Sequence, residues 1–232
     1  MEYKYAENGN YEDFSSGRVL HGGKGIPNFP VRLINEIFGR AAHHLGKEND
    51  LVVYDPCCGG GYSLTVLGFF YSDKIAKIYG SDVDKNMIEH AVKNLSLLQA
   101  GGLDTRKQEL EALYDTYHKD SHKEASTSVE VLKRQLTRPI PSEVFTADCT
   151  KPLPKINPDI IITDIPYGNL VDWNDGAEDS LDAMLESLAG VSDHEIILAL
   201  SMDKKQKFTS TAWEILEKQN IGKRKFLIMR KI

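Results

Sequence analysis

Cysteines and long apolar runs are scarce in this sequence, and each shortage excludes a class of protein. No apolar run approaches the ~20 residues that a membrane-spanning helix needs, and residues 1–4 do not resemble the start of a signal peptide. The three cysteines are too few for a disulfide framework, and neither a C-x-x-C pair nor a paired histidine spacing suggests zinc. We therefore expect a cytoplasmic protein with no membrane segment and no bound metal.

The size and charge of the chain narrow its class further. Its 232 residues, 41% of them hydrophobic, suffice for a sizeable core, and we expect one domain over residues 1–232. A formal net charge of -6 argues mildly against indiscriminate binding to nucleic acid. Basic residues nevertheless gather near the C-terminus, at Lys204, Lys205, Lys207, Lys218, Lys223, Arg224, Lys225, Arg230 and Lys231. This zone is either a solvated surface or a phosphate-binding one, and the sequence leaves both open.

The stretch 51–70 predicts the centre of a ligand site. The apolar, β-branched run 51–54 is typical of a buried strand, which Asp55 ends. Glycines at 59–61 permit a tight turn, and Ser63 can cap the helix that follows. Glycines allow close approach and free helix amides favour a negative group, so this unit suits a nucleotide-like ligand. The spacing is neither G-x-G-x-x-G nor a P-loop, which disfavours a dehydrogenase or a triphosphate site.

Strands and helices alternate along the rest of the chain, which predicts a mostly parallel sheet with helices on both faces. An arm, 1–30, precedes the first helix, and it either faces substrate or packs on the domain. We expect a first helix that starts at Pro30, continues to Leu45 and is stopped by Gly46. Further strands are expected at 77–82, 143–148, 159–164, 195–200 and 225–229. Helices are expected after Asp84, at 179–188 and at 211–218, and a helical insertion at 103–140 is interrupted by the polar stretch 119–128.

Two strand ends carry acids suited to a ligand. Asp82 lies about 20 residues after the glycine turn, where a carboxylate can bind ribose hydroxyls, whereas Asp84 is expected to cap a helix. Asp164 and the carbonyl of Ile165 could accept hydrogen bonds from an exocyclic amine, and Tyr167 could stack on a planar base. Such an arrangement would catalyse by orienting an amino nitrogen. A turn in which the tyrosine merely packs is the alternative.

Both stretches resemble class I S-adenosylmethionine (SAM) methyltransferases. Asp55, Gly59 and Gly61 match D-x-x-x-G-x-G, and 164–167 is similar to [D/N/S]-P-P-[Y/F] with Ile165 in place of the first proline. The resemblance implies a Rossmann-like α/β fold with a seven-stranded-type sheet and SAM as cofactor. It assigns Asp55, Pro56, Cys57, Gly59, Gly61, Asp82, Val83, Asp148 and Cys149 to the cofactor, with Asp148 and Cys149 at the adenine, and Asp164, Ile165, Pro166 and Tyr167 to catalysis.

A closer resemblance covers most of the chain. Segments 16–20, 29–33 and 55–59 look like the avilamycin-resistance family of ribosomal RNA methyltransferases. This implies methylation of a base nitrogen, guanine favoured, in large-subunit RNA, with the base turned out of its stack. Arg18, Arg32 and Tyr167 are then candidate RNA contacts. The alternatives are an enzyme acting on DNA adenine, protein or a small amine, and a noncatalytic RNA-associated protein that binds SAM or a nucleotide. The oligomeric state stays open.

Overall fold

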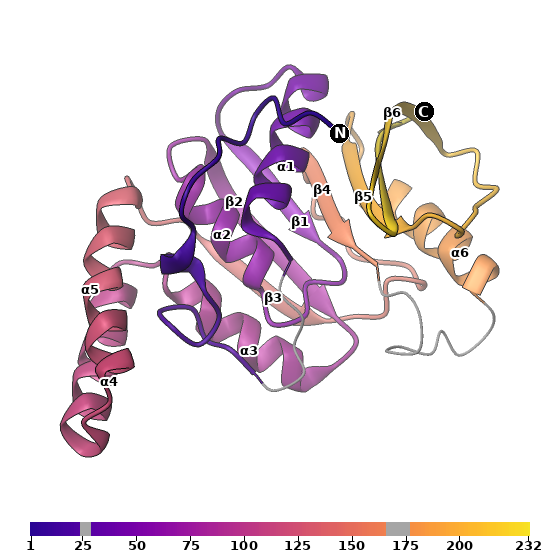
Figure 1. The fold of residues 1–232 in the computed structure, drawn as a ribbon. Coiled ribbons are helices and arrows are strands. Elements are labelled where there is room, and N and C mark those ends of the chain that lie inside the picture. The colour runs from indigo at the N-terminus through magenta and orange to yellow at the C-terminus, as the bar shows by residue number, and fades with distance from the viewer. Residues whose placement is uncertain (24–28, 166–176) are drawn as a thin grey trace.

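A computed structural model describes residues 1–23, 29–165 and 177–232 of the chain. Its centre is a seven-stranded sheet in the order β3-β2-β1-β4-β5-β7-β6 (Figure 1). The strands are β1 (Leu51–Asp55), β2 (Ile75–Asp82), β3 (Ser142–Thr146), β4 (Ile160–Asp164), β5 (Ile197–Asp203), β6 (Trp213–Ile221) and β7 (Arg224–Lys231). The helices are α1 (Val31–Leu45), α2 (Tyr62–Phe70), α3 (Lys85–Ser96), α4 (Gly102–Tyr117), α5 (Asp120–Gln135) and α6 (Ala177–Ala189), with a 3-10 turn at Glu12–Phe14.

The pairing confirms the predicted Rossmann-like, mostly parallel sheet. β1 pairs in parallel with β2 and β4, β2 with β3, and β4 with β5, whereas β7 runs antiparallel to β5 and β6. Alternate residues of a strand face opposite sides of the sheet. Val53 therefore packs in the hydrophobic cluster that contains residues of α1, α2 and α3, whereas Tyr54 packs in the cluster that contains residues of α6. Because β1 to β5 all run in the same direction, their carboxyl ends meet at one edge of the sheet. No described helix combines the length and apolar composition needed to cross a bilayer.

Local signals predicted the limits of several elements correctly. α1 follows Pro30 and ends at Gly46, whose φ of 73° is the left-handed conformation that glycine adopts readily. The insertion is a helical hairpin, but the polar stretch 119–128 does not separate its halves. α5 begins at Asp120, because a single left-handed residue, His118 (φ 51°), reverses the chain.

The helix predicted at 211–218 is wrong, because these residues form most of β6. Trp213 and Leu216 are spaced as on a helix, but a bulge between Ile215 and Glu217 breaks the usual strand alternation. Pairing with β7 across the turn at Gly222 (φ 54°) satisfies the backbone instead. Tertiary pairing outweighed the local pattern here.

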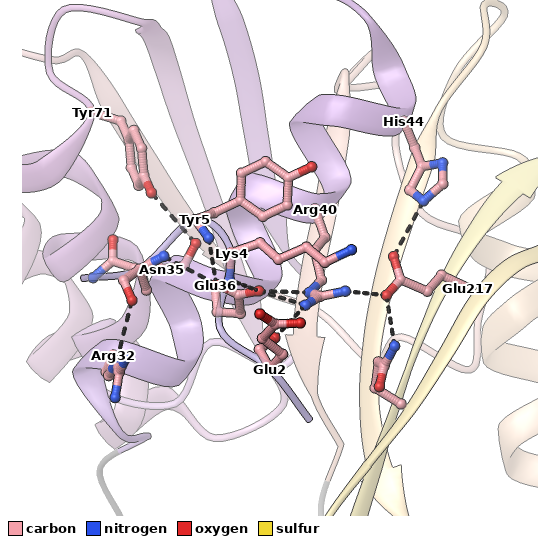
Figure 2. Close-up of polar contacts among 12 residues, drawn as sticks. Glu2, Lys4, Tyr5, Arg32, Asn35, Glu36, Arg40, His44, Tyr71 and Glu217 are labelled. Atoms are coloured by element: carbon pink, nitrogen blue, oxygen red, sulfur yellow. Dashed lines mark hydrogen bonds and ion pairs between the residues drawn. The ribbon is translucent and has the colours of Figure 1, made fainter. Parts of the chain in front are cut away.

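The N-terminal arm packs against the domain through a buried carboxylate. Glu36 of α1 is fully buried and accepts the backbone N–H groups of Lys4, Tyr5 and Ala6 at 2.7 to 3.0 Å. Figure 2 shows Glu36 facing Arg40, which pairs in turn with Glu217 of β6. Burial alone would raise the pKa of Glu36, but these hydrogen bonds outweigh it and lower the pKa. The cluster thus joins the arm, α1 and the sheet edge.

We expect Glu36→Ala to lower the free energy of unfolding by about 3–5 kcal/mol, because buried Arg40 loses its fully buried partner and keeps only the partly exposed Glu217. It also leaves three arm amides without an acceptor. Chemical denaturation followed by circular dichroism measures the loss. As a control, Glu12→Ala removes the partly exposed pair with Arg18, which should contribute no more than about 1 kcal/mol. Equal losses in the two variants would contradict the assignment.

Candidate active site

A cavity of about 240 Å³ opens at the carboxyl ends of β1, β4 and β5. Of the residues predicted from the sequence, it brings together Asp55, Cys57, Gly59 and Asp164. Phe29, Met87 and Arg224 also line it and were not predicted as site residues. A second hollow, of about 360 Å³, lies beside His21 and Arg106 and contains none of the predicted residues. The cavity at the strand ends is therefore the candidate site, as expected for a sheet of this kind.

The glycine loop shapes one wall of this cavity. Gly61 has a φ of 73° and is the N-cap of α2, so the predicted cap at Ser63 is wrong. A Cβ on Gly61 would lie 3.0 Å from Ala91 Cα, and this close approach of α2 and α3 requires glycine. No side chain caps the start of α2, so no side-chain acceptor competes there with a ligand.

Asp82 fixes the loop from the end of β2. Its Oδ2 accepts the N–H of Gly59 at 2.8 Å and its Oδ1 accepts that of Asp84 at 3.0 Å. Asp84 caps α3 through the N–H of Asn86, as predicted. A carboxylate has about four acceptor positions, so Asp82 retains capacity for ribose hydroxyls. That role stays a prediction.

Asp55 is the most strongly perturbed acid of the cavity. It is 5% exposed, and its Oδ1 accepts the N–H of Cys57 at 3.0 Å. Burial, together with the nearby charges of Asp82 and Asp164, raises its pKa from 3.8 to about 7, although the hydrogen bond from Cys57 opposes the shift. Asp55 therefore exchanges its proton near neutral pH, and a positive ligand group beside it would favour the ionised form.

The predicted adenine residues lie beside the cavity and do not line it. Cys149 Sγ is 3.5 Å from Cys57 Sγ, and this contact together with burial raises the pKa of the Cys57 thiol, which stays protonated. Asp148 is exposed and accepts hydrogen bonds from the N–H and hydroxyl of Thr150, which lower its pKa. Pro56 is buried, and Val83, which follows β2, is 69% exposed. Their contacts with a cofactor remain predictions.

Asp164 and Arg224 form an ion pair at the cavity, with Nη1 and Oδ2 3.6 Å apart. Burial raises the pKa of Asp164, and Ser201 and Arg224 only partly oppose it. The other oxygen, Oδ1, is buried and makes no hydrogen bond of ordinary geometry with a described residue. Arg224 also lies over the Phe29 ring, 5.1 Å from its centroid.

The structure describes only one of the other residues predicted to be catalytic. Ile165 is buried and donates its N–H to the carbonyl of Ser201. Pro166 and Tyr167 lie outside the described residues.

The two arginines predicted to contact RNA make contacts within the chain. Arg18 binds Glu12 and Ser128, which ties the arm to α5. Arg32 donates to the carbonyl of Ala6 and lies 4.0 Å from the centroid of the Tyr3 ring. Neither lines the cavity, and their assignment to RNA stays a prediction.

Asn94 is a residue that the sequence analysis missed. Its side chain accepts the N–H of His21 at 2.7 Å and donates to the carbonyls of His21 and Gly60 at 3.0 and 2.8 Å. Asn94 is 1% exposed, so these bonds form away from water. It couples the arm to the glycine loop. Nothing in the helical pattern of α3 distinguishes it from a surface asparagine.

The sheet order, the glycine loop after β1 and the acids ending β2 and β4 define a class I methyltransferase fold. The model of the family described as rRNA methyltransferase AviRa matches residues 1–224. The chain belongs to this family of SAM-dependent rRNA methyltransferases.

Individual relatives agree with this placement. The 23S rRNA (guanine(2535)-N(1))-methyltransferase of Streptomyces viridochromogenes is 34% identical over 239 residues, which cover 98% of this chain and 95% of that protein. The structure of the rRNA methyltransferase AviRa from the same organism superposes with a TM-score of 0.89 at 33% identity, covering 99% of this chain and 96% of the other. A putative methyltransferase from Escherichia coli shares the fold alone, with a TM-score of 0.54 at 14% identity over 89% and 88% of the chains. The family predicted from the sequence is confirmed.

We expect Asp55→Asn to stabilise the protein at pH 8 but hardly at pH 4. Between pH 3.8 and about 7 folded Asp55 holds a proton that the unfolded chain releases, so the free energy of unfolding falls as the pH rises. Asparagine does not ionise, so the variant avoids this pH-dependent fall in the free energy of unfolding, which is about 2–4 kcal/mol at pH 8. Its side-chain oxygen can still accept the N–H of Cys57. Denaturant midpoints at pH 4, 6 and 8 measure it. Parallel pH curves for parent and variant would contradict the raised pKa.

Proposed function

We propose that the protein transfers a methyl group from SAM to N1 of a guanine in 23S rRNA. The observation that carries this proposal is the placement of the Asp164–Arg224 pair in the same cavity as Asp55 and the glycine loop. The relative from Streptomyces viridochromogenes supplies the substrate, because its name specifies guanine N1 of 23S rRNA.

The residues of the cavity, together with those of the glycine loop and the end of β2 beside it, fit SAM. The cofactor carries an ammonium and a sulfonium, and Asp55 would lose its proton beside such a cation, because opposite charge lowers a raised pKa. Gly59 and Gly61 leave room near the helix start, Asp82 can accept ribose hydroxyls, and the exposed Val83 offers an apolar contact to adenine. When bound, SAM supplies a methyl group activated by its sulfonium.

The chemistry of guanine N1 assigns distinct roles to the ion pair. N1 of guanine carries a proton, so its electron pair becomes available for the methyl carbon only as that proton leaves. Asp164 would accept the N1 proton as general base. Its pKa is raised by burial, and its buried Oδ1 makes no hydrogen bond with a described residue, so this oxygen is available for the proton. Negative charge then develops on O6, where the N–H groups of Arg224 can stabilise it.

Cofactor and substrate can be tested separately. Calorimetric titration with S-adenosylhomocysteine should show binding, and NAD should show none. Tritium from labelled SAM should then enter the RNA fraction, with the label located at a guanine by nuclease digestion and mass spectrometry. Label in DNA, in protein or in a small amine would point to one of the other substrates. Binding without transfer to any fraction would favour a noncatalytic protein.

We expect Asp164→Asn to reduce the single-turnover rate of methyl transfer by about 10²–10⁴-fold, because the amide cannot accept the N1 proton. Affinity for S-adenosylhomocysteine should change little, since asparagine retains the size of the side chain. Rapid-quench measurement of labelled rRNA gives the rate.

Asp193→Asn is the control for this variant, since Asp193 lies on the surface beside Lys155 and away from the cavity. It should keep the parent rate. A variant at Asp164 that is equally active would exclude the general-base role.

A further inference from the structure

Five exposed lysines gather on two segments at the C-terminal side of the sheet. Lys204, Lys205 and Lys207 follow β5, whereas Lys218 and Lys223 belong to β6 and its turn to β7. The N–H of Lys204 donates to the carbonyl of Lys223 at 3.2 Å, which joins the segments. We call these five residues the lysine surface. In Figure 1 this side of the sheet, with β5 and β6, lies opposite the helical hairpin α4–α5.

A buried lysine holds the lysine surface in shape. Lys225 of β7 is 8% exposed, and its Nζ donates to the carbonyls of Lys204 and Gln206. Burial lowers its pKa, and the nearby charges of Lys218 and Lys207 lower it further. Asp203 opposes this shift only in part. The charges of Lys207 and Lys218 therefore lie close enough to Lys225 to disfavour its charged form, and a bound anion would relieve this repulsion.

The lysine surface lacks the internal neutralisation found elsewhere on the molecule. None of its five side chains forms an ion pair with a described residue. On the helical hairpin, by contrast, Lys107 pairs with Glu130 and Lys133 with Asp104. Two acids lie next to these lysines in the sequence, but Asp203 accepts the N–H of Lys205 and Glu217 pairs with Arg40. Positive charge is thus left unpaired on one side of a chain whose net charge is -6.

The lysine surface adjoins the candidate active site. Arg224, which lines the cavity and pairs with Asp164, lies in the chain between Lys223 and Lys225. Asp203, at the end of β5, is the register partner of Arg224. An RNA strand whose base entered the cavity would therefore carry its neighbouring phosphates past these lysines.

We propose that the lysine surface binds the phosphates that flank the target nucleotide. This inference rests on the proposed function, because it assigns an RNA contact of the same site. Lysine suits the task as a flexible point charge, since phosphate contacts fix position and carry no sequence information. In a protein of net negative charge, such a surface also orients the approach of RNA toward the cavity.

The test compares two triple variants that remove equal charge. The surface variant carries Lys204→Gln, Lys205→Gln and Lys207→Gln, and the control carries Lys74→Gln, Lys119→Gln and Lys123→Gln, all at exposed positions. Binding to a 23S rRNA transcript is measured by fluorescence anisotropy over a series of KCl concentrations. A second variant, Lys218→Gln with Lys223→Gln, examines the other segment. Unchanged binding of S-adenosylhomocysteine shows that each variant is folded.

We expect the surface variant to bind RNA at least about 10-fold more weakly in 0.1 M salt. Its plot of log affinity against log salt should be shallower by about 2, since each single-strand phosphate contact contributes roughly 0.7. The KM for RNA should rise while kcat stays within about twofold, because no residue of the cavity changes. The control should match the parent.

Three outcomes distinguish this inference from the proposed function. Equal salt slopes in the surface and control variants would overturn it. Normal binding to free RNA with lost activity on assembled ribosomal subunits would overturn it too, and would assign the lysines to an acidic ribosomal protein. If the parent does not methylate rRNA, the proposed function fails, and the salt slopes measured on single-stranded RNA of mixed sequence still decide whether the lysines bind phosphate.

Discussion

Parallel pairing of β1 with both β2 and β4 is the constraint on which the site depends. Parallel strands end on the same side of a sheet, so Asp55, Asp82 and Asp164 come together although they are far apart in the chain. Burial and mutual repulsion then raise the pKa of Asp55 to about 7. In the proposed binding mode, a cationic cofactor beside Asp55 would offset this repulsion and favour the ionised form of the carboxylate.

The antiparallel end of the sheet supplies the opposite charge. Because β7 returns beside β5, Arg224 reaches Asp164, and the turn at Gly222 lies at the same edge as the loop after β5. Parallel strands thus contribute acids to this edge and the antiparallel strand contributes a cation. This division of charge suits the proposed reaction, in which a cationic methyl donor and an anionic RNA strand would bind side by side.

The N-terminal arm is part of the same assembly. Glu36 and Arg40 bind it to α1 and β6, and Asn94 joins its residue His21 to Gly60 of the glycine loop. The buried ends of both connections are polar. Their geometry therefore depends on complete hydrogen bonding, since a lost partner leaves a buried charge or amide unpaired.

The sequence by itself determined the glycine turn, the capping Asp84 and the limits of α1, because glycine, proline and short polar side chains act on the backbone within a few residues. It also indicated the family, since the motifs around Asp55 and Asp164 are short and local. Only the tertiary structure decided that 213–221 is a strand, that Arg224 meets Asp164 and that the lysines of two segments converge. Those features follow from the order of the strands and from pairing between residues far apart in the sequence. Local residue spacing does not predict either of them.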